Sequence, residues 1–155
     1  MAQSKNTKPD AKTLAEAARV CACFNFRKAS RAVTQLFDTV LQPSGLRSTQ
    51  FVILVAIGAE GQPNLPGLAR SLNVDRSTLT RNLQPLARDG LLRVSEGRGE
   101  RASIVRLTPK GERLLAATVP LWEKAQGRFV EMFGGQRWPS MLADLNRVVD
   151  AAHGA

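Results

Sequence analysis

One short segment of the chain carries hydroxyl, guanidinium and amide side chains at helical spacing. At 100° per residue, its polar side chains (Ser77, Arg81, Gln84 and Arg88) fall on one side of a helix and its leucines (Leu79, Leu83 and Leu86) on the other. A hydroxyl near a helix N-terminus can bind phosphate or base edges, and an arginine can donate two hydrogen bonds to guanine O6 and N7. These residue types indicate recognition of a partner through hydrogen bonds and not a reaction in which covalent bonds form or break.

Residues 68–83 predict two short helices joined by a tight turn. Ala69 is small where the helices would cross, Asn73 tolerates the left-handed backbone of a sharp turn, and Asp75 can cap the second helix. This pattern is a helix-turn-helix and indicates binding to DNA. The second helix, with its outward polar face, is the expected recognition helix.

Composition and charge favour a globular protein with a polyanionic partner. The chain has 155 residues, of which 43% are hydrophobic and 23% charged, which suits one domain with a real core. Its net charge of +9 is uneven, because residues 62–113 hold ten Lys and Arg against five Asp and Glu, whereas residues 114–155 hold four of each. Nine of those ten are Arg, which suits phosphates and guanine edges. From charge alone, a polyanionic partner and the alternative, in which the basic charge only aids solubility or gives sequence-blind adhesion, are equally favoured.

Apolar periodicity and turn residues predict further helices and one hairpin. The expected helices cover 11–41, without Gly or Pro, 48–59, which is nearly all apolar, 109–133, begun by Thr108 as cap and Pro109, and 137–151. Runs 91–95 and 102–107 predict a β-hairpin whose tip, 96–101, bears arginines.

Two prolines fall inside expected helices. Pro85 removes a hydrogen bond to the Arg81 carbonyl, so we expect it to bend or end the recognition helix early. Arg88 is therefore a weaker candidate for DNA contact than Arg81. Pro120 is expected to kink the helix over 109–133.

The first helix and the last two carry more apolar surface than the central unit can cover. We expect them to cover each other between two chains. A symmetric dimer would place its recognition helices about one DNA turn, roughly 34 Å, apart, which matches an inverted repeat. An intramolecular bundle in a monomer is the alternative.

Three strings in this order resemble a known family: Asp75-Arg76-Ser77-Thr78-Leu79-Thr80-Arg81, Gly90-Leu91-Leu92, and Leu107-Thr108-Pro109-Lys110-Gly111. Over roughly residues 14–150 the chain resembles the MarR family of winged-helix bacterial transcription regulators. The resemblance implies a mainly α fold with a small β-hairpin wing, a winged helix-turn-helix flanked by N- and C-terminal dimerisation helices. It also implies a homodimer, and repression that a small-molecule effector or an oxidant relieves.

The expected organisation is a disordered tail over 1–9 and a single MarR-like domain over 10–155. Within that domain, the winged helix-turn-helix covers 46–108. The dimerisation helices cover 10–45 and 109–152.

The function expected is sequence-specific DNA binding by a transcriptional repressor, on double-stranded DNA with an inverted-repeat operator. The expected DNA-binding residues are Arg76, Ser77, Thr78, Arg81 and Gln84 on the recognition helix, with Arg98 and Arg101 on the wing. The resemblance places Ser77, Thr78 and Arg81 in the major groove and Arg101 in the minor groove, whereas Arg98 is proposed from charge and loop position. The alternative is a sequence-blind architectural DNA-binding protein.

Cys23 is a candidate redox sensor. The segment Cys23-Phe24, followed by Ala29-Ser30-Arg31, resembles the one that holds the peroxide-reactive cysteine in the organic-hydroperoxide branch of the family. That branch uses tyrosines to support the thiolate, and this chain contains none. A small buried apolar residue is the alternative. On a continuous helix, Cys21 and Cys23 would diverge by about 200°, which argues against a bridge between them.

Other function classes find little support in the sequence. No nucleophile and base pair up, no Gly-rich phosphate loop occurs and the single His153 lies at the end, so we expect neither an enzyme nor a metal or cofactor. The N-terminus lacks a secretory signal and no run approaches the ~20 apolar residues of a membrane span, so a cytoplasmic protein without a membrane partner is expected.

Overall fold

The computed structural model describes residues 8–95 and 103–153. Contacts within the chain divide it into two units, Met1–Gln35 and Leu36–Ala155. The single domain expected over 10–155 therefore stays a prediction. The expected tail over 1–9 falls almost wholly outside the described residues.

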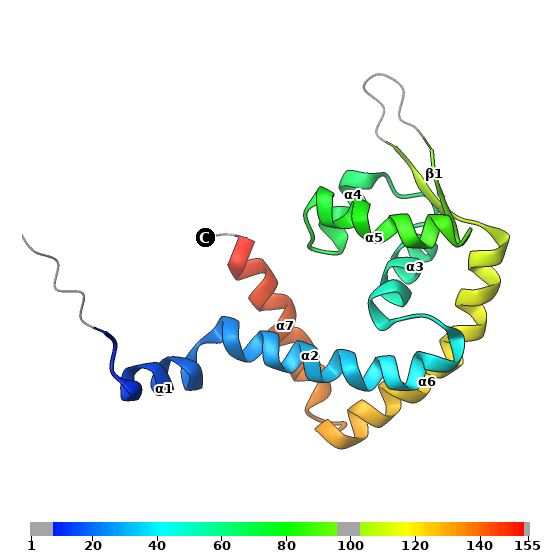
Figure 1. Cartoon of the computed structure of the whole chain (residues 1–155). Helices are drawn as coiled ribbons and strands as arrows, with labels where there is room; N and C mark the ends of the chain where they lie inside the picture. Colours follow the sequence, from blue (N-terminus) through cyan, green and yellow to red (C-terminus); the bar gives the residue numbers. More distant parts are fainter. Residues whose placement is uncertain (1–7, 96–102, 154–155) are drawn as a thin grey trace, which may run out of the picture. The chain divides into compact units, whose positions relative to one another are not determined.

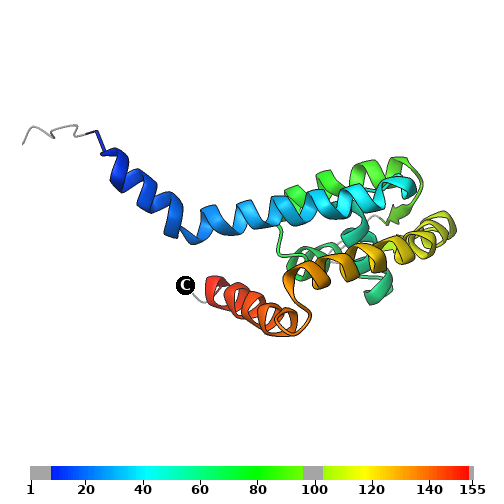
Figure 2. The ribbon, with the colours of Figure 1, turned by 90° about the horizontal axis from the view of Figure 1, so that it is seen from below.

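The first unit is helical but not one helix. α1 (Ala11–Val20) begins at Asp10, whose side chain accepts from the Thr13 amide, and ends at Cys21, whose backbone is extended. α2 (Ala22–Leu41) follows after that break and runs across the boundary between the units. Figures 1 and 2 show the change of direction between the two helices. The expectation of an unbroken helix over 11–41 is wrong at this residue.

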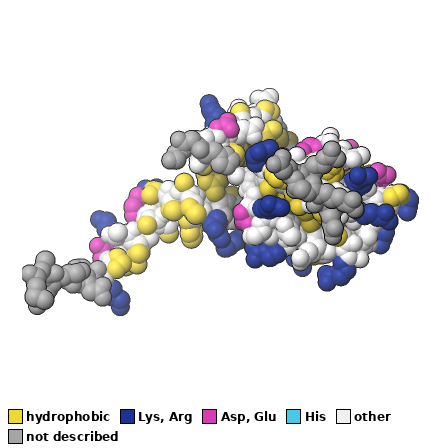
Figure 3. Space-filling view, turned by 90° about the horizontal axis from the view of Figure 1, so that it is seen from above, with side chains coloured by type: hydrophobic (Ala, Val, Ile, Leu, Met, Phe, Trp, Pro, Cys, Tyr) yellow, Lys and Arg dark blue, Asp and Glu magenta, His cyan; other side chains and the backbone are white. Residues whose placement is uncertain are grey.

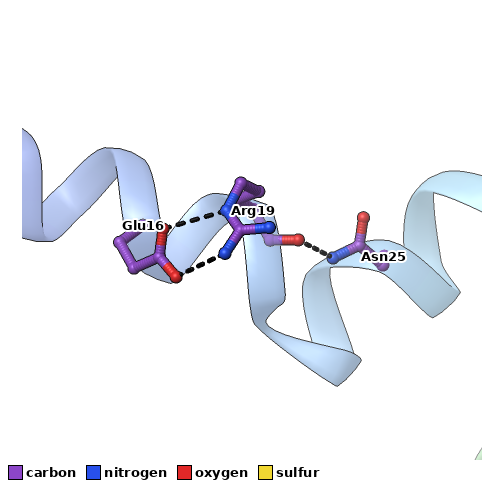
Figure 4. Close-up of polar contacts among 3 residues, drawn as sticks. All are labelled: Glu16, Arg19 and Asn25. Carbon is purple, nitrogen blue, oxygen red and sulfur yellow. Dashed lines mark hydrogen bonds and ion pairs between the residues drawn. The ribbon is translucent and has the colours of Figure 1, made fainter.

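A side-chain amide stabilises the break. Asn25 Nδ2 donates to the carbonyl oxygens of Arg19, at 3.1 Å, and Cys21, at 2.9 Å. In a continuous helix the Arg19 carbonyl would accept from the Cys23 amide, so the Asn25 side chain replaces the bond lost there. The Cys21 carbonyl keeps its helical bond from the Asn25 backbone amide and accepts the side-chain amide in addition. Figure 4 shows Asn25 reaching back to Arg19, whose guanidinium pairs with Glu16. No glycine or proline marks this site, which is why periodicity missed it.

The second unit packs short helices around one apolar core. After a 3-10 turn, η1 (Gln42–Ser44), and Gly45 with φ +75°, α3 (Ser48–Glu60) begins with the Ser48 amide donating to Asp38 Oδ1 at 2.6 Å. α3 buries four large side chains, as its nearly all-apolar sequence predicts, namely Phe51, Ile53, Leu54 and Ile57. α4 (Leu65–Ser71) and α5 (Arg76–Arg88) add leucines to the same cluster.

The hairpin is confirmed and is shorter than expected. β1 (Leu92–Val94) pairs antiparallel with β2 (Val105–Leu107), with Leu92 opposite Leu107 and Val94 opposite Val105. Figure 1 shows it standing beside α5. α6 (Pro109–Phe133) starts at the predicted Thr108 cap, whose side chain accepts from the Gly111 amide, and α7 (Trp138–His153) follows. α6 continues through Pro120 for its full predicted length.

No single helix among the described residues is both long and apolar enough to cross a membrane. One bent pair, α2 with α3, reaches the required length and composition only when its helices are counted together. Four large side chains of α3 are buried in the core, as expected for a core helix of a folded domain.

The start of α6 is fastened to the end of α5. Thr108 donates through its amide to Leu91 O at 3.0 Å and through its hydroxyl to Gly90 O at 2.6 Å. Lys110 Nζ donates to Asp89 O at 2.8 Å. Gly111 lies so close that a Cβ there would meet Leu91 O at 2.0 Å, which leaves no room for any larger residue.

Gly111→Ala is therefore expected to lower the free energy of unfolding by about 1–3 kcal/mol, because the carbonyl of Leu91 is backbone and must move. Gly127→Ala, on the same helix, is the matched control. A Cβ at Gly127 meets nothing within 4 Å, so this change should raise stability by about 0.5–1 kcal/mol. Urea unfolding of the three proteins measures both effects. Equal stability of the two variants would contradict the close approach.

Candidate nucleic-acid interface

A leucine stripe sets the orientation of α5. Leu79, Leu83 and Leu86 are all buried, with Leu79 and Leu86 at 0% exposure. They pack in the same cluster as Leu68 and Ala69 of α4, where the small Ala69 side chain suits a close helix approach. This packing leaves the opposite face of α5 to solvent.

The turn between α4 and α5 has the geometry that the sequence predicts. Asn73 has φ +51°, the only non-glycine residue with positive φ in the described part of the chain. The Val74 amide donates to Ala69 O at 3.0 Å, closing the turn. The helix-turn-helix expected over 68–83 is confirmed in its turn, its cap and its core leucines.

The wing is joined to the start of α4 through backbone hydrogen bonds. The Leu65 amide donates to Ser103 O and the Val105 amide donates to Pro63 O, both at 2.9 Å. An isolated antiparallel bridge pairs Asn64 with Ile104, and the Asn64 side chain also caps α4. The strands of the wing and both helices of the motif therefore form one framework.

Asp75 organises the polar end of α5. One of its carboxylate oxygens accepts from the Ser77 hydroxyl at 2.5 Å and the Thr78 amide at 2.7 Å, and the other from the Thr78 hydroxyl at 2.7 Å. Arg81 Nη2 donates in turn to Thr78 Oγ1 at 3.2 Å. Three of the candidate DNA-binding side chains thus belong to one network centred on a residue that we proposed only as a cap.

The same network affects the ionisation of Asp75. Its hydrogen bonds from the Ser77 hydroxyl, the Thr78 hydroxyl and the Thr78 amide hold the pKa of this carboxyl well below its usual range. Both hydroxyl protons point to the carboxylate, so toward any further partner the hydroxyl oxygens act as acceptors, and that of Thr78 already accepts from Arg81 Nη2. Such oxygens can accept from the exocyclic amino groups of adenine or cytosine.

The candidate residues of α5 lie on its exposed side. Arg76, Ser77, Arg81 and Gln84 are exposed, and Thr78 is half-buried. Figure 3 shows Lys and Arg side chains gathered over this part of the molecule. Figure 3 therefore supports a basic surface around the motif.

Pro85 does not end α5 early, which corrects that part of the expectation, whereas the bend at Pro85 stays a prediction. The helix runs to Arg88, and Leu83 and Leu86 on either side of Pro85 are buried. Their packing holds the helix together where one backbone hydrogen bond is missing. Arg88 is exposed in the last turn.

The remaining candidate residues lie elsewhere. Arg98 and Arg101 fall outside the described residues, as does the hairpin tip at 96–101. Cys23 is exposed near the start of α2, and Cys21 is exposed in the break. The argument against a Cys21–Cys23 bridge assumed a continuous helix, and that assumption fails at Cys21. No group of three metal-ligating residues occurs among residues 8–95 and 103–153.

Asp75 was predicted only as a helix cap, not as the acceptor for the Ser77 and Thr78 hydroxyls. The pattern that predicts this role is an Asp followed two and three residues later by hydroxyl residues, since short polar side chains there hydrogen-bond locally. The hydrogen bond from Arg81 to Thr78, which joins Arg81 to the network, depends on the side-chain rotamers of both residues, and the sequence pattern does not specify these.

Comparison with known proteins finds transcription regulators. The family model for the MarR family matches residues 46–101. The HTH-type transcriptional regulator SarZ of Staphylococcus saprophyticus is 32% identical over 91 residues, 58% of this chain and 62% of SarZ. The chain thus spans somewhat under two thirds of that curated relative.

Solved structures match over nearly their whole length. The M. tuberculosis transcriptional regulator MosR in complex with DNA is 39% identical, with a TM-score of 0.79, covering 86% of this chain and 97% of MosR. A second structure of the M. tuberculosis regulator MosR is 37% identical, with a TM-score of 0.77, covering 90% of this chain and 100% of MosR. The chain belongs to the MarR family. This confirms the expected winged helix-turn-helix and a DNA-binding transcription regulator, not an enzyme.

Asp75→Asn and Asp75→Ala separate the two roles of Asp75. Asparagine caps helices about as well as aspartate, so Asp75→Asn should keep α5 folded while Asp75→Ala weakens it. The lowered pKa of Asp75 adds stability that is present above the ordinary carboxyl range and lost as pH falls through the folded-state value. The stability advantage of the wild-type protein over Asp75→Asn should therefore shrink as pH falls below about 4.

Urea unfolding at several pH values measures this difference. Glu60→Gln is the control, because Glu60 is an exposed carboxyl at the end of α3. A constant difference between wild type and Asp75→Asn across the acid range would contradict the network.

Proposed function

We propose that this protein is a homodimeric, sequence-specific transcriptional repressor. The observation that carries the proposal is the rigid seating of α5 on buried leucines, with its opposite face polar and prearranged by Asp75. In this proposal α5 enters the major groove, where Arg76, Ser77, Thr78, Arg81 and Gln84 contact base edges and phosphates. Arg98 and Arg101 of the wing contact the minor groove. A chromosomal operator would place the protein in the cytoplasm.

Exposed apolar side chains support the dimer. In the first unit Leu14, Val20, Phe24 and Phe26 are exposed, with Val20 at 58%. In the second unit the exposed set includes Met132, Met141, Leu142, Val148 and Val149. Surfaces of this kind on helices are covered when a second copy binds. Two copies suit an inverted-repeat operator.

Release of the operator follows from geometry in this proposal. A small-molecule effector or an oxidised thiol that alters the angle between the subunits misaligns the two recognition helices. Operator affinity then falls without a change in either helix, because both must engage at one spacing.

Binding of the pure protein to DNA flanking its own gene tests the proposal. We expect a preference for that DNA over random duplex at one salt concentration, with a footprint over an inverted repeat. Arg81→Ala should cost about 1–3 kcal/mol of binding free energy and relax preference at one base position, because its paired hydrogen bonds select guanine. Fluorescence anisotropy with single-base operator variants measures both.

Arg88→Ala is the control, since Arg88 lies in the last turn of α5 and should affect base preference less. An operator that keeps only one half-site should bind much more weakly if the dimer is correct. Equal affinity for operator and random duplex would instead support the architectural alternative, and equal losses by Arg81→Ala on all duplexes would reduce Arg81 to a phosphate contact.

We propose an oxidant as one means of release, with Cys23 as the sensing thiol. A hydroperoxide would oxidise the Cys23 thiolate to a sulfenic acid and be reduced to its alcohol. Attack by the Cys21 thiol on that sulfur would form a disulfide and release water. Two observations support this step: both thiols are exposed, and the extended backbone of Cys21 frees it from helical geometry.

Treatment with tert-butyl hydroperoxide is expected to lower the operator affinity of the wild-type protein, and dithiothreitol should restore it. The Cys23→Ser variant should keep its operator affinity in the presence of the hydroperoxide. In the Cys21→Ser variant, oxidation of Cys23 should stop at the sulfenic acid, which intact mass spectrometry detects. A disulfide between two chains, visible on a non-reducing gel, would show that the partner thiol belongs to the second copy. The sensing role of Cys23 is wrong if Cys23→Ser responds like the wild type.

A further inference from the structure

Two arginines face each other across the wing. The register places Arg93 of β1 directly opposite Arg106 of β2. The pairs on either side are Leu92 with Leu107 and Val94 with Val105, and Leu92 and Val105 are buried. Since side chains alternate along a strand, the two arginines share the opposite, outer face of the sheet. Both are exposed.

This pair lacks a counter-charge in the part of the chain that the structure describes. The ion pairs there join Arg19 with Glu16 and Arg147 with Asp144, and neither guanidinium of the wing pair takes part in one. Like charges directly opposite each other on a sheet are destabilising. The pair therefore lowers the stability of a two-stranded sheet unless an anion lies over it.

The position of the pair is fixed relative to the recognition helix. β1 packs against α5, and β2 is bonded through Val105 to Pro63 just before α4. Ser95 closes the next rung, donating its amide to Ile104 O at 2.9 Å and accepting from the Ile104 amide through its hydroxyl at 3.1 Å. A group bound at the arginine pair is thus held at a set distance from α5.

We propose that Arg93 and Arg106 together bind a phosphate of the DNA backbone, beside the groove that α5 enters. The inference rests on the proposed DNA partner but not on sequence preference. A guanidinium donates two parallel hydrogen bonds to phosphate oxygens, and two guanidiniums on adjacent strands match the charge and the several acceptors of a phosphodiester. The contact positions the protein and carries no base information.

Salt dependence tests the pair. Each neutralised phosphate releases counterions, so the double variant Arg93→Gln with Arg106→Gln should lower the magnitude of the slope of log affinity against log salt by about 1, and each single variant by part of that amount. The loss should be equal on operator and random duplex, measured by anisotropy of a labelled 30-base-pair DNA. Arg93→Lys keeps the charge and should keep the slope.

Arg128→Gln is the matched control, because Arg128 is an exposed arginine of α6. It should leave the slope unchanged. The melting temperature of the double variant should not fall, since the change removes a repulsion, and Arg93→Lys with Arg106→Lys provides a second folded comparison.

Three results would overturn the inference. The first is a double variant whose salt slope equals that of the wild type. The second is a loss of affinity on the operator but not on random duplex. The third is a reduction of the slope by Arg128→Gln that equals the reduction by the double variant. Failure of the proposed function looks different, because the wild-type protein would then show no preference for its operator. The slope on random duplex would still test the arginine pair in that case.

Discussion

Burial of three leucines governs how α5 can rotate about its own axis. Leu79, Leu83 and Leu86 are almost wholly removed from solvent, and exposing any one of them would cost about 1.5–3 kcal/mol. A turn of the helix by one residue would expose these side chains and bring polar residues such as Thr80 and Gln84 toward the core in their place. The polar face of α5, and with it any contact to DNA, depends on this constraint.

The hydrogen bonds of Asp75 then refine what that face offers. Ser77 and Thr78 are held to one carboxylate, and Arg81 is held to Thr78, so these side chains have fewer conformations to lose when a ligand binds. The rotation of the helix decides which residues face outward. The capping residue decides how their hydroxyls are oriented.

The recognition helix is also coupled to the next long helix through the backbone. Thr108, Lys110 and Gly111 at the start of α6 all engage carbonyls of residues 89–91, just after α5 ends. The two hydrogen bonds of Thr108 and the close approach of Gly111 allow little relative movement here, because they involve main-chain atoms or a short side chain. The start of α6 is therefore held closely against the residues that follow α5.

The sequence by itself determined the helix-turn-helix, the cap at Asp75, the left-handed Asn73, the hairpin and the start of α6 at Thr108. Each of these depends on local backbone preferences or on a period that a few residues display. Only the tertiary structure decided that α1 and α2 break at Cys21, where the Asn25 side chain donates to the Arg19 carbonyl in place of a lost helical hydrogen bond. It also decided that α5 runs through Pro85, because the packing of Leu83 and Leu86 outweighs one missing bond. Neither the side-chain bonds of Asn25 nor the packing beside Pro85 leaves a periodic trace in the chain, so both become visible only in the folded structure.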